Sequence, residues 1–461
     1  MESLFKVNFN WGVYFLLLVV MRVVFVDISW LSFIAFSITI HQFILLFNSL
    51  GSVIPIRYMA GLLMCVQMLL GPAFAFNGLD EYQYITYKMK IPEYDYFMYV
   101  IPATILFILG LHVTAGKLKG EVLEEMAIAR YVDRSGTLPY IFIGVGFFSS
   151  VASSFFSSTF NFVFILLGNA KFIGLFMLLL GSKKLRPLPI ILVMGSIIMD
   201  ALSIAMFHDL IIWLVMLGAI LGIKYRVKLV FKSVATTVFL LLVIVIQILK
   251  TDYRKTSSLE GTGAQSMEKV FRDKQENKSL FSYEKLAESN IRINQGYIVT
   301  NIMNTVPVAV PFQNGTELLQ ILEAAFLPRL IAPNKLNAGD RFIFMKYTGL
   351  LLRQGTSMGL SSVGDAYINF GVMGGSIFMF FLGLMFSEVL NGFFRASKHY
   401  PILLIFTTVV FYYPIRPDCE LQTILGHLVK STFLIFVVVQ IWKHRFARIR
   451  KLTSDNVLSH S

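Results

Sequence analysis

The chain consists of long apolar runs separated by short polar connections. A run of about 20 apolar residues is long enough to cross the hydrocarbon core of a bilayer as an α-helix. The pattern predicts about twelve such spans, at 11–27, 29–50, 54–76, 97–116, 138–157, 159–181, 188–206, 208–223, 229–249, 368–390, 401–414 and 423–442. A membrane β-barrel would instead alternate apolar and polar residues. The sequence therefore predicts an all-α, polytopic membrane protein with about twelve transmembrane helices.

One connection, between the ninth and tenth predicted spans, is far longer than the others. The predicted organisation is helices 1–9 over residues 1–249, a large loop over 250–367, helices 10–12 over 368–442 and a basic tail over 443–461. Within the loop, residues 316–327 place Leu319, Leu322 and Phe326 on one helical face. This spacing predicts an amphipathic helix that either lies on the membrane surface or packs on the end of the helical bundle.

Lysine and arginine are distributed unevenly between the two sides of the predicted bundle. Twenty of them fall in the short connections and the tail on one side, and three fall in the short connections on the other. The positive-inside rule then places the basic side, with both termini, in the cytoplasm and the large loop outside, because long loops cross regardless of charge. The formal net charge is +13, but the basic residues are placed as the orientation of a membrane protein requires, so we expect no nucleic acid partner.

The composition argues against a soluble domain, a disulfide framework, a clustered metal site and a nucleotide site. The 461 residues are 56% hydrophobic and only 15% charged, with a mean hydropathy of +0.69, which is unlike a soluble domain. Two cysteines and seven scattered histidines predict neither a disulfide framework nor a clustered metal site. No glycine-rich nucleotide fingerprint occurs. We therefore expect no cofactor and no metal.

Several arginines fall on the predicted outer face. Arg329, Arg341 and Arg353 come from the large loop, and Arg416 comes from the last outer turn. The planar fork of arginine binds phosphate oxygens bidentately and stays charged, so the group predicts a pyrophosphate site. For each arginine alone, the alternative is a contact with lipid phosphates or with a loop carboxylate.

Candidate proton acceptors lie on the same face. Asp365 closes the large loop, Asp418 follows Arg416, and His208 with Asp209 occupies another outer turn. A carboxylate or an imidazole could take a proton from a sugar hydroxyl as a general base. Asp365, His208 and Asp418 are therefore the predicted catalytic residues.

Aromatic and acidic residues suggest a place for sugar rings. Asp80, Glu81 and Tyr82 lie in an outer loop that is rich in tyrosine, and Tyr367 ends the large loop. We predict these four as glycan-binding residues, with stacking by the rings and hydrogen bonds to the carboxylates. The alternative is an interfacial belt, since tyrosine is enriched where membrane meets water.

Two segments and the general layout resemble the bacterial O-antigen polymerase family. The run from Gly359 to Gly375 is similar to that family's small residues, acid and Tyr-x-Asn-Phe-Gly at a helix start. Arg416-Pro-Asp418 is similar to the arginine and acid in its last outer turn. The resemblance implies a glycosyltransferase class C-like fold and a polymerase on the outer face of the bacterial inner membrane. Such a polymerase joins oligosaccharide repeat units carried on undecaprenyl pyrophosphate into a surface polysaccharide, without a nucleotide sugar.

The resemblance also assigns roles to residues. It implies that Arg341, Arg353 and Arg416, and more weakly Arg329, hold pyrophosphate. Many members have an arginine where this chain has His208 and Asp209, so the general base stays open among the three candidates. The implied partners are the undecaprenyl pyrophosphate-linked oligosaccharide, the lipid bilayer and a chain-length regulator.

Two other functions fit the same layout. An O-antigen ligase would differ in its acceptor, although no histidine between His208 and His399 offers a counterpart to the outer-loop histidine of ligases. A transporter or flippase of lipid-linked glycans needs charges along a path through the membrane. Four charged residues lie within predicted spans, namely Arg22, Lys171, Asp200 and Lys430. The chain has no visible internal repeat, which weakens the transporter hypothesis.

Overall fold

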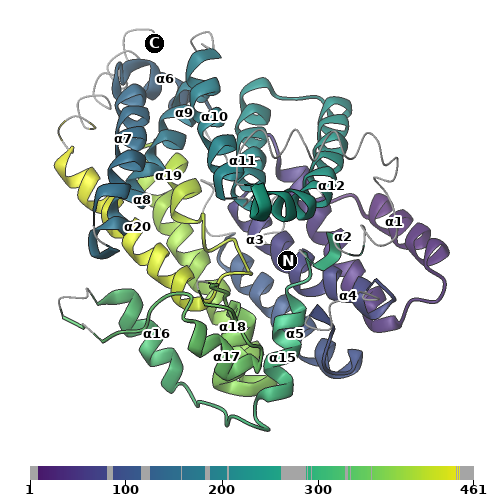
Figure 1. Cartoon of the computed structure of the whole chain (residues 1–461). Helices are drawn as coiled ribbons and strands as arrows, with labels where there is room; N and C mark the ends of the chain where they lie inside the picture. Colours follow the sequence, from purple (N-terminus) through teal and green to yellow (C-terminus); the bar gives the residue numbers. More distant parts are fainter. Residues whose placement is uncertain are drawn as a thin grey trace.

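The computed structural model describes residues 9–79, 87–115, 125–156, 158–181, 187–204, 207–260, 287, 289–291, 293–327, 331–332, 334–354, 356–442, 444 and 446. These residues form helices joined by turns, with no strand among them (Figure 1). The prediction of an all-α protein is confirmed.

Eight helices in the described part of the chain are long and apolar enough to cross a membrane. They are α2 (Trp30–Ser49), Ile56–Phe76 with α3 (Ile56–Cys65) and α4 (Gly71–Phe76), α5 (Glu93–Val113), Val163–Leu180 with α8 (Ser158–Gly168) and α9 (Ala170–Leu180), α11 (His208–Tyr225), the first part of α12 (Leu229–Glu260), α18 (Ser362–Ser397) and α20 (Leu421–Ile441). A ninth would combine α6 (Glu125–Arg134) with α7 (Leu138–Ala152), which are bent by 79° at their junction. Each of these helices overlaps a predicted span.

In the described residues, the helices at the other three predicted spans are shorter than expected. α1 (Trp11–Val24) falls below the crossing length, and so does the apolar part of α10 (Pro187–Ile204), whose neighbours on both sides lie outside the described residues. α19 (Leu403–Val410) has only eight residues, or about 12 Å, against a hydrocarbon core of about 30 Å. From Phe411 onward the chain turns and is largely buried in the protein, where non-helical backbone is tolerated at membrane depth. The run at 401–414 looked like a span because this buried turn is itself apolar.

The closest helix contact lies between α5 and α18. A Cβ atom added at Gly110 would lie 2.2 Å from the Phe380 carbonyl oxygen, and one added at Gly383 would lie 2.2 Å from the Phe107 carbonyl oxygen. Glycines let the two backbones approach closely, which is how helices associate inside a bilayer. Towards the start of α18, the Tyr99 hydroxyl donates to the Val363 carbonyl at 2.6 Å. α5 therefore fixes the position of the α18 segment that carries Asp365.

Three short helices of the predicted large loop cover one end of the molecule (Figure 1). They are α15 (Gly296–Thr305), α16 (Thr316–Phe326) and α17 (Arg341–Thr348). α16 packs on α20 with Ile321, Ala324 and Ala325 buried, while Leu319 and Phe326 are exposed. The predicted helix is confirmed. It packs on the bundle, but with a face other than the predicted apolar one.

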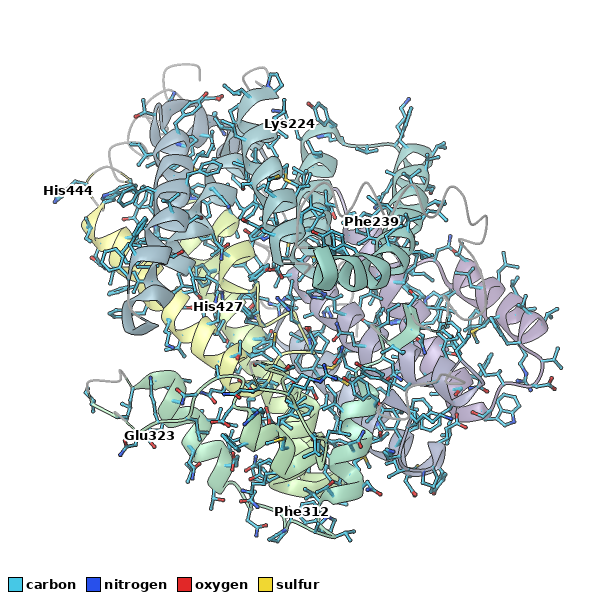
Figure 2. All side chains as sticks on the ribbon, in the orientation of Figure 1. Lys224, Phe239, Phe312, Glu323, His427 and His444 are labelled. Carbon is cyan, nitrogen blue, oxygen red and sulfur yellow. The ribbon has the colours of Figure 1, made fainter. Side chains whose placement is uncertain are left out.

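The predicted sides of the membrane correspond to opposite ends of the molecule. Lys224 and His444 lie at one end, and Glu323 and Phe312 lie at the other, with His427 between them (Figure 2). α12 continues as a helix to Glu260 and α18 begins at Ser362, so helix extends into both edges of the segment predicted as a loop. Which end faces the cytoplasm stays a prediction.

Candidate functional site

A buried arginine joins two turns that are distant in the sequence. Arg416 lies between α19 and α20 and is 8% exposed. Its Nη1 donates to Asp209 Oδ1 at 3.0 Å, and its Nη2 donates to Asp418 Oδ2 at 3.2 Å. Asp209 lies in the first turn of α11, 207 residues earlier. The guanidinium also lies 5.3 Å from the ring centroid of Tyr413, a cation–π distance.

The charges of this pair stabilise each other. Burial acts to raise the pKa of Asp418, but Arg416 and His208 outweigh it and lower that pKa to about 2. Burial acts to lower the pKa of Arg416, but Asp418 and neighbouring groups raise it well above its usual value. Both side chains are therefore ionised at neutral pH. Because Arg416 has two carboxylate partners, its fork is already occupied.

A histidine faces the second oxygen of Asp418. His208 Nε2 lies 3.9 Å from Asp418 Oδ1, and no described residue hydrogen-bonds to that oxygen or to Arg416 Nε. This distance is too long for a direct hydrogen bond. Both atoms are buried, so the imidazole and the ionised carboxylate face each other out of contact with solvent.

Asp365, one of the three predicted catalytic residues, lies in the first turn of α18. Its side chain is buried, and its Oδ2 accepts a hydrogen bond of 2.7 Å from the backbone N–H of Leu421. Leu421 is the first residue of α20, whose N–H has no partner within the helix. Asp365 thus joins the start of α18 to the start of α20, next to the turn that carries Arg416.

The large loop is attached to the same turn. The Gly339 N–H donates to Glu420 Oε1 at 2.6 Å, and the Gln422 side chain donates to the Leu336 carbonyl at 2.8 Å. Burial raises the pKa of Glu420, partly offset by its hydrogen bonds from Gly339 and Thr423. The loop therefore lies against the turn rather than apart from it.

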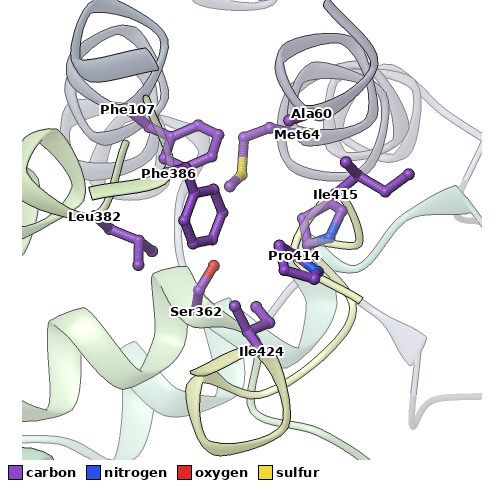
Figure 3. Close-up of a pocket in the computed structure, with 10 residues that line it drawn as sticks. Ala60, Met64, Phe107, Ser362, Leu382, Phe386, Pro414, Ile415 and Ile424 are labelled. Atoms are coloured by element: carbon purple, nitrogen blue, oxygen red, sulfur yellow. The ribbon is translucent and has the colours of Figure 1, made fainter. Parts of the chain in front are cut away.

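A small cavity lies behind the turn (Figure 3). Its lining includes Met64, Phe107 and Phe386 from the helices and Pro414 from the turn. Ser362 contributes the one hydroxyl side chain among the lining residues. None of the lining residues is charged, so this cavity offers no partner to a charged group.

The predicted arginines of the loop are placed differently from Arg416. Arg341 is the first residue of α17, half-buried, behind an N-cap in which Asp340 accepts from the N–H of Phe342. Arg353 is exposed. Neither makes an ion pair with another residue in the part of the chain that the structure describes. Among the described residues their forks bind no carboxylate, unlike that of Arg416, and the Arg341 guanidinium lies 4.9 Å from the ring centroid of Phe342.

Other predicted site residues lie elsewhere. Tyr367 is buried, with its ring 5.1 Å from that of Tyr99 and 5.6 Å from that of Phe312, so it packs the bundle instead of offering a face to a sugar. The remaining predictions concern Asp80, Glu81, Tyr82 and Arg329, which lie outside the described residues. The glycan-binding roles of Asp80, Glu81 and Tyr82 therefore stay predictions.

One functional candidate was missed in the sequence. Arg57 was counted among the cations of the basic side, but it is 3% exposed. Its Nη1 donates to the Leu111 carbonyl and to Ser387, and its Nη2 donates to Asn391 Oδ1 at 2.7 Å. The available signal was Ser387 and Asn391, two polar residues four apart at the end of the apolar run that became α18. Arg57 thereby joins α3, α5 and α18.

Metal ligands do not gather in the described part of the chain. No group of three or more His, Cys, Asp and Glu side chains is arranged to hold an ion there.

Comparison with known proteins gives one match. The family described as Domain of unknown function (DUF8712) matches residues 96–416. The chain belongs to this family. The match to DUF8712 starts in α5 and ends at Arg416, so it includes His208, Asp209 and the whole large loop. No curated protein and no solved structure matches the chain, and the resemblance to O-antigen polymerases stays a prediction.

Proposed function

We propose that this DUF8712 protein is a polymerase that lengthens a glycan carried on undecaprenyl pyrophosphate at the outer face of the bacterial inner membrane. The observation that carries the proposal is the Arg416–Asp418–His208 cluster. A buried arginine holds a carboxylate ionised, and that carboxylate lies 3.9 Å from an imidazole nitrogen. We propose that the acceptor hydroxyl of the sugar loses its proton at this cluster.

His208 is the proposed general base. Asp418, with a pKa of about 2, is too weak a base to remove a proton from a sugar hydroxyl efficiently. Its carboxylate instead stabilises the imidazolium that forms when His208 accepts the proton, the role that a carboxylate has in catalytic triads. Arg416 is a positioning residue, because both ends of its fork already bind Asp209 and Asp418.

Arg341 and Arg353 are the proposed pyrophosphate ligands. Both belong to the loop attached to the turn through Gly339 and Glu420, and neither has a described carboxylate partner. In the reaction, the bond from the sugar C1 to the pyrophosphate oxygen breaks and a bond from C1 to the acceptor oxygen forms. Arginines near the leaving group stabilise the charge that it gains in the transition state. The proton passes from the acceptor hydroxyl to His208 and then to the released pyrophosphate or to water.

The test uses purified protein in liposomes with a synthetic polyprenyl pyrophosphate-linked repeat unit. We expect wild-type protein to produce a ladder of lengthened glycans. We expect His208→Gln to reduce the rate by about 10²- to 10⁴-fold, the usual contribution of a general base. Arg341→Gln and Arg353→Gln should raise the donor concentration needed for half-maximal rate.

Arg395→Gln is the matched control. Arg395 is exposed at the far end of α18 and pairs loosely with Glu388 at 3.8 Å, so this change should leave the ladder unchanged. A full ladder from both the His208 and the Arg341 variants would refute the assignment. Transfer of the glycan to lipid A core, with no ladder, would make the protein a ligase instead.

A further inference from the structure

A second cavity, of about 190 Å³, lies inside the helical bundle. It separates α20 from α7, α8 and α9, which are its neighbours in Figure 1. Along α20 the lining extends from Ser431 to Ile441 and then to Trp442. On the opposite side, Val145 of α7 and Leu167 of α8 are among the lining residues. This cavity, the α20 cavity, is distinct from the candidate site, which lies at the first residues of α20.

The lining of the α20 cavity favours an apolar ligand over water. Ser431 and Trp442 are the only described lining residues with a polar side-chain atom, and the Ser431 hydroxyl donates to the His427 carbonyl at 2.6 Å. A buried water needs two or more polar partners, and an engineered apolar cavity of about 150 Å³ stays dry and binds benzene. An empty cavity of this kind also loses the dispersion contacts of its walls. A hydrocarbon ligand would supply them.

The position of the α20 cavity along its helix indicates one leaflet of the bilayer. α20 has 21 residues, which at about 1.5 Å per residue match a hydrocarbon core of about 30 Å. Ser431 is the middle residue of α20 and Ile441 is the last, so the cavity covers about 15 Å, or half of the core. This half lies towards His444 and away from Glu323 (Figure 2). A donor at the candidate site would belong to the opposite leaflet.

The α20 cavity is accessible from the bilayer at the same end. Ile441 lines the cavity and is nevertheless 69% exposed, while Leu434 and Val438 are half-exposed. Tryptophan, here Trp442, is enriched where membrane meets water. The sequence then continues with five basic residues within nine positions, namely Lys443, Arg445, Arg448, Arg450 and Lys451. A basic segment next to a membrane helix attracts anionic lipid head groups.

We propose that the α20 cavity binds one acyl chain of an anionic phospholipid, whose head group is held by the basic residues that follow Trp442. The apolar lining selects the chain, the length of the cavity matches the reach of a lipid in one leaflet, and the basic segment selects the negative charge. The bound chain fills the space between α20 and α7–α9, so it stabilises their packing. This role is independent of the proposed function, because the cavity and the candidate site lie in opposite halves of the membrane.

The test uses native mass spectrometry of the purified full chain in detergent. The probes are phosphatidylglycerol, which is anionic, and zwitterionic phosphatidylcholine with the same acyl chains. We expect wild-type protein to retain one phosphatidylglycerol, bound about tenfold more tightly than phosphatidylcholine, since each basic residue near the head group contributes about 1 kcal/mol. Added phosphatidylglycerol should also raise the midpoint of thermal unfolding, because a ligand that binds the folded state stabilises it.

Val145→Trp places a large side chain at the half-exposed lining of the α20 cavity. We expect it to lose the bound lipid and the rise of the unfolding midpoint. Val151→Trp is the matched control, because Val151 belongs to the same helix and is 64% exposed without lining the cavity. It should bind phosphatidylglycerol as wild type does. Equal binding by the two variants would overturn the assignment to this cavity.

The head group is tested by Lys443→Gln combined with Arg445→Gln, which leaves the cavity lining unchanged. We expect this variant to bind phosphatidylglycerol about tenfold more weakly and phosphatidylcholine as before. Equal affinity of the two lipids for wild-type protein would overturn the anionic phospholipid. Displacement of the bound phosphatidylglycerol by an equal concentration of polyprenyl phosphate would also overturn it and would assign the cavity to a polyprenyl chain.

Discussion

The α5–α18 pair and α12 differ in how far apolar helices of one protein are packed against their neighbours. In α5 and α18, 56% and 44% of the crossing windows are buried, and glycine brings the two backbones into contact at Gly110 and Gly383. In α12 none of the window is buried, although its mean hydropathy of 2.6 exceeds that of either partner. The more apolar helix is therefore the less packed one.

The contrast follows from what holds helices together inside a bilayer. Lipid tails are as apolar as leucine side chains, so hydrophobicity inserts a helix but does not attach it to another. α5 and α18 are attached by close backbone contact and by hydrogen bonds from Tyr99 and Arg57. α12 has polar attachments at its two ends and large apolar residues between them.

The largest expected effect is at the helix crossing. Replacing Gly383 by valine places a side chain 2.2 Å from the Phe107 carbonyl oxygen, so the helices must separate. We expect a loss of about 3 kcal/mol or more, at the upper end for overpacking, seen as a lower midpoint of thermal unfolding in detergent. Gly392→Val in the same helix is the control, because a Cβ there meets nothing within 4 Å. Equal losses in the two variants would mean that close approach does not hold this pair together.

The next effect comes from the buried arginine. Arg57→Leu removes the donor to Asn391 and Ser387 and leaves buried acceptors without partners. We expect a loss of about 2 kcal/mol, since an unsatisfied buried polar group costs about 1–3 kcal/mol. The exposed Arg395 is the control, and Arg395→Leu should change the unfolding midpoint little. An Arg57 variant as stable as wild type would show that the bonds to α18 are not needed.

A smaller effect is expected where α5 meets the start of α18. Tyr99→Phe keeps the ring and removes the hydroxyl that donates to the Val363 carbonyl at 2.6 Å. The expected loss is about 1 kcal/mol, the net value of one hydrogen bond, measured by the same unfolding midpoint. Tyr140→Phe, at a 45% exposed position, should be neutral. A neutral Tyr99→Phe would leave the glycine contact as the main attachment.

The smallest effect should come from α12. Leu241→Ala removes a side chain that is 55% exposed, and the stability should change by less than about 0.5 kcal/mol. The matched change is Leu382→Ala in α18, where the side chain is 4% exposed and a buried leucine costs about 2–5 kcal/mol to truncate. Similar losses at the two positions would mean that α12 packs on the bundle after all.

Hydropathy predicted where the long apolar helices lie, but it did not predict the contacts between the residues of the candidate site. Apolar runs located every long helix because length and composition decide insertion. They failed at 401–414, since the residues of the buried turn are as apolar as those of a helix. The burial of Arg57 was not predicted, because the sequence shows that a residue is charged but not whether it is buried between helices.

The site shows the same limit at the level of single residues. The sequence could place His208, Arg416 and Asp418 on one side of the membrane, because topology decides sides. It could not show that Arg416 already binds two carboxylates or that Asp365 bonds to the Leu421 N–H. These hydrogen bonds depend on how the helices pack, and helix packing cannot be predicted from the charge or the periodicity of the sequence.

The hydrogen bonds to Glu420 and Leu421 have a consequence for the biogenesis of the protein. Gly339 and Asp365 are synthesised well before these two partners. Until translation has passed residue 421, the Gly339 N–H and the Asp365 carboxylate therefore lack the partners that they have in the folded chain. A nascent chain released after α19 would carry His208, Arg341 and Arg353 but would lack Arg416 and Asp418, so the Arg416–Asp418–His208 cluster would be incomplete. The end of translation, rather than the insertion of the earlier helices, completes this region.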